Sequence, residues 1–178
     1  MKFTGNVYRA HNPRWSHAPT SGEGARLYGG RFNPKGVPAL YTSTTQLTAI
    51  REAQQGFPFK PAPLTICAYD VNCTDVADLT SPAGVKELSP EAQALADRHV
   101  LACAWEDLSS RKLDPPSWQL ARQLVKDGWA GVLVPSFATG AVEGDTNIVF
   151  WTWAADPPHQ VRVIDPGNDL PRNDLSWR

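Results

Sequence analysis

The side chains best suited to chemistry lie in one short run of the chain, from Gly29 to Glu52. Arg31 follows two glycines in a turn, Tyr41 lies in a short apolar stretch, and Glu52 falls within a predicted helix. A turn, a strand and a helix in this order can bring the three side chains to one cleft. A guanidinium fork suits an anionic diphosphate, an aromatic ring stacks on a flat group, and a carboxylate stabilises developing positive charge. This combination suits the cleavage of a nucleotide's glycosidic bond.

Glu52 is predicted to lie on a helix over 44–55, which Ser43 would cap through an S-x-x-Q pattern. Leu47 and Ile50 share one face of that helix, and we expect them to pack on the core. Glu52 follows Ile50 by two residues, about 200° around the helix axis, and so points away from that face. The ordinary interpretation is a solvated glutamate. Its face-mates are small residues that leave room for a ligand, namely Thr45, Thr48 and Ala49.

Arg31 and Tyr41 also have ordinary interpretations. An arginine in a turn can pair with a nearby acid, and a tyrosine that alternates with Leu40 and Thr42 can be a half-buried strand residue. The glycines before Arg31 permit a positive φ and a close approach of a ligand to the backbone. No GK[ST] follows and no G-x-G-x-x-G opens a helix, so neither a Walker motif nor a dinucleotide fingerprint is present.

Two polar residues later in the chain could complete the same cleft. Ser136 ends an apolar strand, and Asn147 opens the next one. Ser136 lacks the G-x-S-x-G context of a nucleophile, so we expect it to donate a hydrogen bond or to cap a turn. The four histidines show no metal-binding spacing, and a metal site is not expected.

The composition is that of a single soluble globular domain over residues 1–178. Hydrophobic residues make up 42% of the chain and charged residues 20%, and the net charge is −1. Because there is no basic surplus, direct nucleic-acid binding is not expected. The apolar stretches are too short to span a bilayer, and the first residues lack the hydrophobic core of a signal peptide. Three cysteines, an odd number without metal spacing, indicate reduced thiols in the cytoplasm.

Alternation and helical periodicity predict an α+β fold with a mixed or antiparallel sheet and flanking helices. Residues 11–30 are predicted to form a long loop, and 166–178 a polar C-terminal tail. The predicted strands are 6–10, 39–43, 64–71, 75–79, 130–134, 147–153 and 160–164, and the predicted helices are 44–55, 90 to about 103, and 116–126.

Several of these segments together resemble the RES domain, named for its Arg, Glu and Ser. The resemblance runs from about Tyr8 to Ile164 and is strongest to the ParT type. Phe32 stands where the family often has Trp, which keeps an aromatic ring. The segments that carry the resemblance are Tyr8-Arg9, Gly30-Arg31-Phe32-Asn33-Pro34, Ala39-Leu40-Tyr41-Thr42-Ser43, Ala49-Ile50-Arg51-Glu52 and Val134-Pro135-Ser136.

The resemblance implies a fold like that of the ADP-ribosyltransferases, with NAD+ as co-substrate. It assigns the site to Glu52, Arg31 and Tyr41. From the chemistry of these side chains we expect Glu52 to face the developing cation, Arg31 to bind the diphosphate and Tyr41 to stack on nicotinamide. The candidates for NAD+ binding are Arg9, Arg31, Tyr41, Ser136 and Asn147.

Members of the RES family are toxins of bacterial toxin–antitoxin modules. The resemblance therefore implies a cytoplasmic toxin and a cognate Xre-like antitoxin that covers the cleft near Arg31 and Glu52. The favoured activity is transfer of ADP-ribose to a protein acceptor. Hydrolysis or phosphorolysis of NAD+ without a protein target is the alternative within the same chemistry. A non-catalytic nucleotide-binding module and a purely structural interaction domain are the alternatives outside it.

Overall fold

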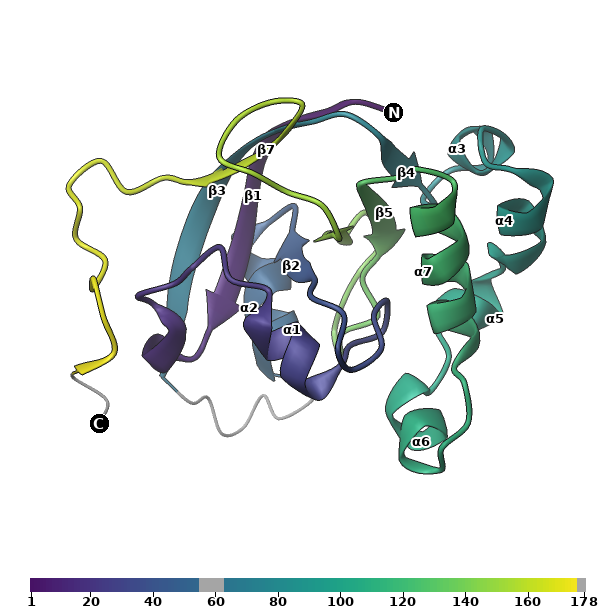
Figure 1. Cartoon of the computed structure of the whole chain (residues 1–178), viewed down its shortest axis with the longest axis horizontal. Helices are drawn as coiled ribbons and strands as arrows, with labels where there is room; N and C mark the ends of the chain where they lie inside the picture. Colours follow the sequence, from purple (N-terminus) through teal and green to yellow (C-terminus); the bar gives the residue numbers. More distant parts are fainter. Residues whose placement is uncertain (55–62, 176–178) are drawn as a thin grey trace.

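A computed structural model describes residues 1–54 and 63–175 (Figure 1). Its strands are β1 (Phe3–His11), β2 (Leu40–Ser43), β3 (Thr65–Cys73), β4 (Val76–Asp78), β5 (Gly131–Pro135), β6 (Thr146–Phe150) and β7 (His159–Val163). They form one sheet in the order β4-β5-β6-β2-β1-β3-β7, in which β4 and β5 are parallel and the other neighbours antiparallel. The predicted α+β fold with a mixed sheet and flanking helices is confirmed.

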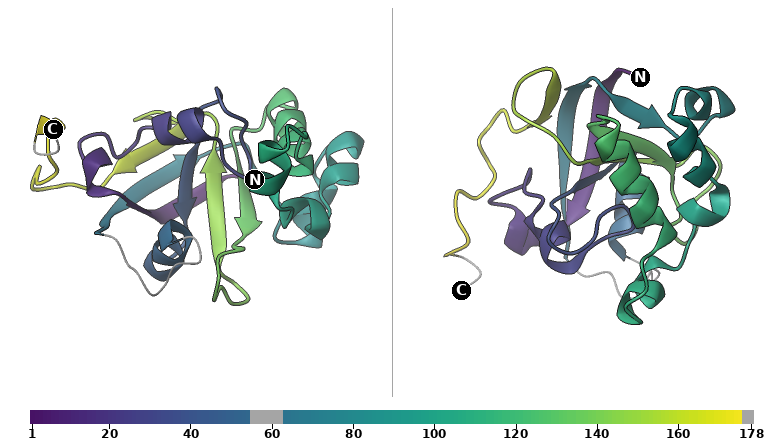
Figure 2. Two further views of the ribbon diagram at one scale, coloured as in Figure 1. Left: turned by 90° about the horizontal axis from the view of Figure 1, so that it is seen from below. Right: turned by 45° about the vertical axis from the view of Figure 1, so that its right-hand side comes forward.

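The helices lie on both sides of this sheet and at one end of it. The last five gather beyond the β4–β5 edge, while the first two lie on opposite sides of β1 and β3 (Figures 1 and 2). No helix in the described part of the chain is long and apolar enough to cross a membrane. The bounds are α1 (Glu23–Tyr28), α2 (Gln46–Gln54), α3 (Pro82–Lys86), α4 (Pro90–Leu95), α5 (Arg98–Leu101), α6 (Trp105–Ser110) and α7 (Pro116–Lys126), with a 3-10 turn η1 at Pro13–Trp15.

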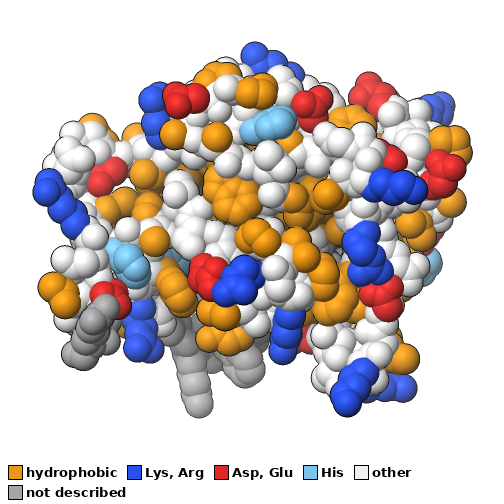
Figure 3. Space-filling model, viewed as in Figure 1, with side chains coloured by type: hydrophobic (Ala, Val, Ile, Leu, Met, Phe, Trp, Pro, Cys, Tyr) orange, Lys and Arg blue, Asp and Glu red, His pale blue; other side chains and the backbone are white. Residues whose placement is uncertain are grey.

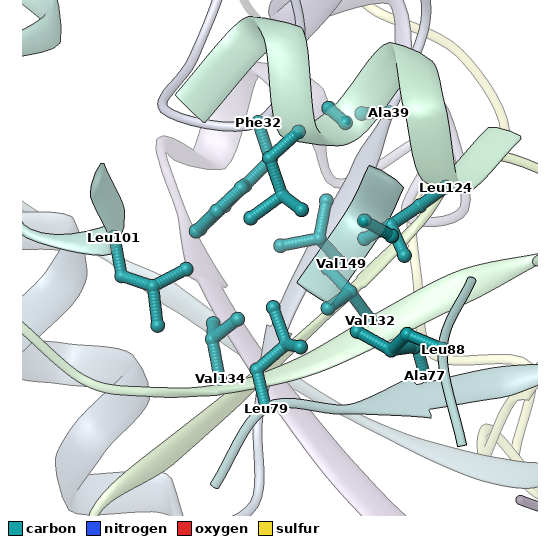
Figure 4. Close-up of a cluster of buried hydrophobic side chains, with 13 residues drawn as sticks. Phe32, Ala39, Ala77, Leu79, Leu88, Leu101, Leu124, Val132, Val134 and Val149 are labelled. Carbon is teal, nitrogen blue, oxygen red and sulfur yellow. The ribbon is translucent and has the colours of Figure 1, made fainter. Parts of the chain in front are cut away.

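The sheet separates two apolar cores, because alternate strand residues face opposite ways. Val132 and Val149 pack with Leu124 of α7 in one core, which Figure 4 shows in close-up. Leu40 and Phe150 pack in the other. On the face in Figure 3, acidic and basic side chains are interspersed among hydrophobic ones.

Some predicted elements differ from the observed ones. The expected loop over 11–30 contains η1 and α1. The helix expected from Pro90 is divided into α4 and α5, because Ala96 leaves helical geometry and the Asp97 carboxylate caps a new start at His99 N. α7 has the predicted bounds of 116–126. Gln55, the predicted last residue of the second helix, lies outside the described residues.

Candidate active site

Glu52 lies near the end of α2, where two later segments of the chain meet its carboxylate. Ser136 Oγ donates to Glu52 Oε1 over 2.6 Å, and Asn147 Nδ2 donates to the same oxygen over 2.5 Å. In residues 1–54 and 63–175, neither hydrogen bond nor ion pair engages the other carboxylate oxygen, Oε2. Two donors therefore fix the carboxylate, and one oxygen is left to accept from a ligand.

The strand register brings Asn147 to this position. Asn147 pairs with Ser43 on β2 and with Val134 on β5, so the three side chains share a face. Ser43 Oγ donates to Asn147 Oδ1 over 2.7 Å, which turns the amide nitrogen toward Glu52. Ser136 follows Val134 by two residues and thus returns to the same face.

The buried face of α2 is the one that carries Glu52, which corrects the sequence prediction. Thr48 and Ala49 are buried, whereas Leu47 is 54% exposed. The prediction followed hydrophobicity, but the small side chains allow α2 to approach the sheet closely. The hydroxyl of Thr48 is satisfied by Asp145 Oδ1 at 2.8 Å, so its burial costs little. Glu52 therefore points toward the protein and not into bulk solvent.

The cap of α2 also differs from the prediction. Thr45 Oγ1, and not Ser43 Oγ, accepts the hydrogen bond from Thr48 N at 3.1 Å. Ser43 remains in β2, where its hydroxyl orients Asn147. A capping pattern with several adjacent hydroxyl residues does not say which of them caps the helix.

Asp145 connects the loop between β5 and β6 to α2 by hydrogen bonds. Its carboxylate accepts from Thr48 Oγ1, from Arg51 Nη1 at 2.7 Å and from Val142 N at 3.0 Å. Its backbone carbonyl accepts from Ser136 N at 2.8 Å. The Val142 N–H, then the Thr48 hydroxyl and the Arg51 guanidinium, hold the pKa of Asp145 below its usual value. The same residue thus holds both ends of the loop that supplies Ser136.

We expect Asp145→Asn to lower the free energy of unfolding at pH 7 by about 1–3 kcal/mol, because a charged acceptor of three hydrogen bonds is lost. Since the folded pKa of Asp145 is lowered, its contribution is present above the unfolded pKa and is lost as pH falls through the folded value. Urea unfolding at pH 7 and near pH 3 should therefore show a difference from wild type that shrinks in acid. Asp107→Asn, at an exposed surface pair, is the matched control. A difference that does not depend on pH would contradict this role.

Arg31 lies beside the segment that follows Ser136. Its guanidinium carbon is 5.2 Å from the centroid of the Phe137 ring, a cation–π distance. Arg31 Nη1 donates to the carbonyls of Leu101 at 3.1 Å and Cys103 at 2.6 Å. Its Nε and Nη2 make no hydrogen bond within the part of the chain that the structure describes, so the guanidinium retains donors for an anion.

Tyr41 holds the turn that carries Arg31. Its hydroxyl accepts from Phe32 N at 2.9 Å and donates to Asn33 Oδ1 at 2.7 Å. Gly30 allows this approach, because a Cβ there would lie 2.4 Å from the hydroxyl oxygen. Burial raises the pKa of Tyr41 above its ordinary value, against the opposing effects of the Phe32 N–H and the Arg31 charge. The phenol therefore stays protonated near neutral pH, and the close approach at Gly30 serves a side chain of this protein.

Arg9 lies elsewhere. Its Nη1 donates to the carbonyls of Pro19 at 3.1 Å and Ser21 at 2.9 Å, and it lines a pocket with His11. The structure thus brings Glu52, Ser136 and Asn147 into contact, places Arg31 beside Phe137, and sets Arg9 apart from them.

Ser43, Asn33 and Asp145 are parts of the site that sequence reasoning missed. Ser43 follows Tyr41 by two residues on the same strand, and this period-2 relation to a candidate residue was the available signal. Asn33 bonds to residues within eight positions of it, and its place in the Gly30–Pro34 segment was the available signal. Asp145 bonds to Thr48 and Arg51, more than ninety positions away, which no local pattern reveals. Among the described residues there is no group of three His, Cys, Asp or Glu side chains placed to hold a metal ion.

Comparison with known proteins gives the family. The RES domain model matches residues 6–173, nearly the whole chain. Among solved structures, a chain in the crystal structure of the M. tuberculosis MbcT–MbcA toxin–antitoxin complex superposes with a TM-score of 0.60 at 22% identity, over 93% of this chain and 84% of that one. No curated protein sequence matches this chain. The structural likeness supports the fold, and the family match covers the residues of the Glu52 cluster. The chain therefore belongs to the RES domain family.

Proposed function

We propose that this chain is the toxin of a bacterial toxin–antitoxin module and that it cleaves NAD+ and transfers the ADP-ribose to a protein. The observation that carries the proposal is the Glu52 carboxylate, which Ser136 and Asn147 hold by one oxygen while the other remains available. A carboxylate fixed in this way is organised before substrate binds, so little free energy is needed to reorganise it during the reaction.

The chemistry requires stabilisation of positive charge on the nicotinamide ribose as the glycosidic bond breaks. Glu52 Oε2 accepts a hydrogen bond from a ribose hydroxyl, and its negative charge faces the developing oxocarbenium ion. That attraction grows toward the transition state, which is the condition for raising kcat. Ser136 and Asn147 keep the carboxylate in place. Nicotinamide leaves with the bonding electron pair, and the acceptor attacks the opposite side of the ribose.

Arg31 binds the diphosphate of NAD+ through its remaining donors. We expect Arg31→Ala to raise the Kd for NAD+ by about 10- to 100-fold, which corresponds to the loss of one or two charge-assisted hydrogen bonds. Isothermal titration calorimetry measures this, and Arg26→Ala removes an exposed, salt-bridged arginine as the control.

Arg31 also donates to two backbone carbonyls, so the stability of Arg31→Ala must be measured beside its affinity. A stability loss with an unchanged Kd would show that Arg31 serves only the fold.

The experiment that tests the proposed function incubates the purified chain with NAD+ labelled in the adenylate portion, with and without bacterial lysate. Nicotinamide release together with label on a discrete protein supports transfer. Nicotinamide release with free ADP-ribose, or with its phosphate, identifies the alternative of hydrolysis or phosphorolysis. NAD+ binding without nicotinamide release identifies a non-catalytic nucleotide-binding module, and the absence of both rejects the proposal.

A toxin that consumes NAD+ in the cytoplasm needs an inhibitor, and we propose a ParT-like arrangement with an Xre-like antitoxin that covers the site near Arg31 and Glu52. The chain with structural likeness comes from a toxin–antitoxin complex, which supports a partner of this kind. Co-purification of the antitoxin from the same operon, with loss of nicotinamide release in the complex, tests the arrangement.

A further inference from the structure

A pocket lies on the other side of β1 from α2. Because strand side chains alternate, Arg9 and His11 share one face of β1, and they line the pocket together with Trp15 of η1 and Gly24 of α1. Figure 2 shows the first helix on the other side of β1 from α2. The pocket is lined by Arg9, His11, Trp15, Ala18, Pro19, Ser21 and Gly24, none of which belongs to the Glu52 cluster.

The loop between β1 and α1, which forms the rim of this pocket, is held in place by hydrogen bonds with residues outside the loop. Arg9 Nη1 and the Tyr69 hydroxyl both donate to the Pro19 carbonyl, the latter over 2.7 Å. Trp153 Nε1 donates to the Thr20 carbonyl over 2.9 Å, and Ser16 Oγ donates to Thr65 Oγ1 over 2.7 Å. The pocket therefore exists before any ligand binds, and its occupant would not have to order the loop.

Arg9 has no acidic ion-pair partner among the described residues. None of the ion pairs in residues 1–54 and 63–175 includes it, and its Nη1 contacts are to neutral carbonyls. Burial lowers the pKa of Arg9, against the opposing effect of the Tyr69 hydroxyl. Arg9 is half-buried, and a charge that is partly removed from water is ordinarily paired, so its surroundings favour an anion.

His11 is a second polar group without a partner in the same pocket. The residue is 8% exposed, and within residues 1–54 and 63–175 neither Nδ1 nor Nε2 has a hydrogen-bond partner. Burial and the Arg9 charge lower the pKa of His11 to about 4, so the ring is neutral near pH 7 and offers one N–H donor and one acceptor. Buried polar atoms are nearly always satisfied, and two unsatisfied atoms on one ring indicate an absent partner.

We propose that the Arg9–His11 pocket binds a small oxyanion, with the anion accepting from the guanidinium of Arg9 and from the ring N–H of His11. The pocket's small volume, about 40 Å³, limits the occupant to a group of a few heavy atoms, such as a phosphate or a carboxylate, either free or at the end of a larger molecule. Trp15 lines the pocket and is 37% exposed, so a larger molecule would extend to solvent past its side chain. The site does not depend on the proposed reaction at Glu52.

The test follows the ring nitrogens of His11 by NMR in protein labelled with ¹⁵N-histidine and without NAD+, during titration with inorganic phosphate, sulfate and acetate. Saturable shifts of the His11 resonances are expected. Shifts with phosphate and sulfate alone identify a tetrahedral oxyanion, and shifts with acetate alone identify a carboxylate. Absent or non-saturating shifts, as for a pocket that holds only water, would overturn the proposal.

His11→Leu removes both nitrogens and leaves Arg9 in place. The saturable rise in Tm that the anion gives to wild type should be lost in this variant and kept in His99→Leu, which alters an exposed histidine. Equal rises in all three proteins would overturn the assignment to this pocket. If circular dichroism shows that His11→Leu is unfolded, the wild-type NMR titration decides alone. Nicotinamide release is not a readout here, so failure of this proposal is distinguishable from failure of the proposed function.

Discussion

Glu52→Gln is expected to lower the kcat for nicotinamide release by about 10²- to 10³-fold while the Kd for NAD+ stays within about twofold. The amide keeps the shape of the side chain and can still accept from Ser136 or Asn147, so the site remains assembled. What disappears is the negative charge, whose attraction for the ribose grows as the glycosidic bond breaks. A loss in kcat without a loss in affinity is the signature of an interaction made in the transition state.

Single-turnover nicotinamide release and equilibrium NAD+ binding, measured on the same preparations, check this result. Glu143→Gln makes the same chemical change at an exposed position of the loop between β5 and β6 and should behave as wild type. A Glu52→Gln protein that releases nicotinamide at a nearly normal rate would remove Glu52 from the mechanism.

Asn33→Asp is expected to reduce the free energy of unfolding at pH 7 by on the order of 3–5 kcal/mol. Asn33 is fully buried, and its Nδ2 donates to the carbonyls of Ala25 at 2.9 Å and Val37 at 2.8 Å, with a longer contact to that of Pro34. Its Oδ1 accepts from Tyr41. The substitution replaces Nδ2 by a carboxylate oxygen that faces these carbonyls. Like partial charges then repel, and the N–H donors of the amide are lost.

The destabilisation in Asn33→Asp should diminish as the pH is lowered. Burial among acceptors raises the folded pKa of the new carboxyl, so stability is recovered below its unfolded pKa and lost as pH rises through the folded value. Urea unfolding between pH 3 and pH 7 measures the trend, with Asn168→Asp on the surface as the control. A loss of less than about 1 kcal/mol at pH 7 would mean that Asn33 is not the centre of this turn.

The sheet and the central contact of the site could be predicted because each depends on patterns that the chain carries locally. Alternating apolar residues marked the strands, and α7 carried a regular apolar stripe between Pro116 and Lys126. Ser136 was expected to end one apolar strand and Asn147 to open the next, where both could meet the cleft, and in the structure both donate to the Glu52 carboxylate.

The errors arose where a long-range partner decided the outcome. The buried face of α2 was assigned by hydrophobicity, but Asp145 satisfies Thr48 and makes the polar face the inner one. The assignment of Arg9 to NAD+ by its place in a motif stays a prediction; in the structure its Nη1 donates to the carbonyls of Pro19 and Ser21. Short helices such as α3 and α6 complete less than two turns, too little for a period to be visible.

The position of β6 in the sheet sets the moment in translation at which the site can first exist. β6 lies between β2 and β5, yet it is the last strand but one to leave the ribosome. A nascent chain carries Arg31, Tyr41 and Glu52 early, but β2 and β5 have no common neighbour, and Glu52 no amide donor, until Asn147 has been made. A chain that stalls or is cut short before that point therefore lacks the Asn147 contact that fixes the Glu52 carboxylate. Under the proposed function, late assembly would reserve activity for chains in which β6 has been completed.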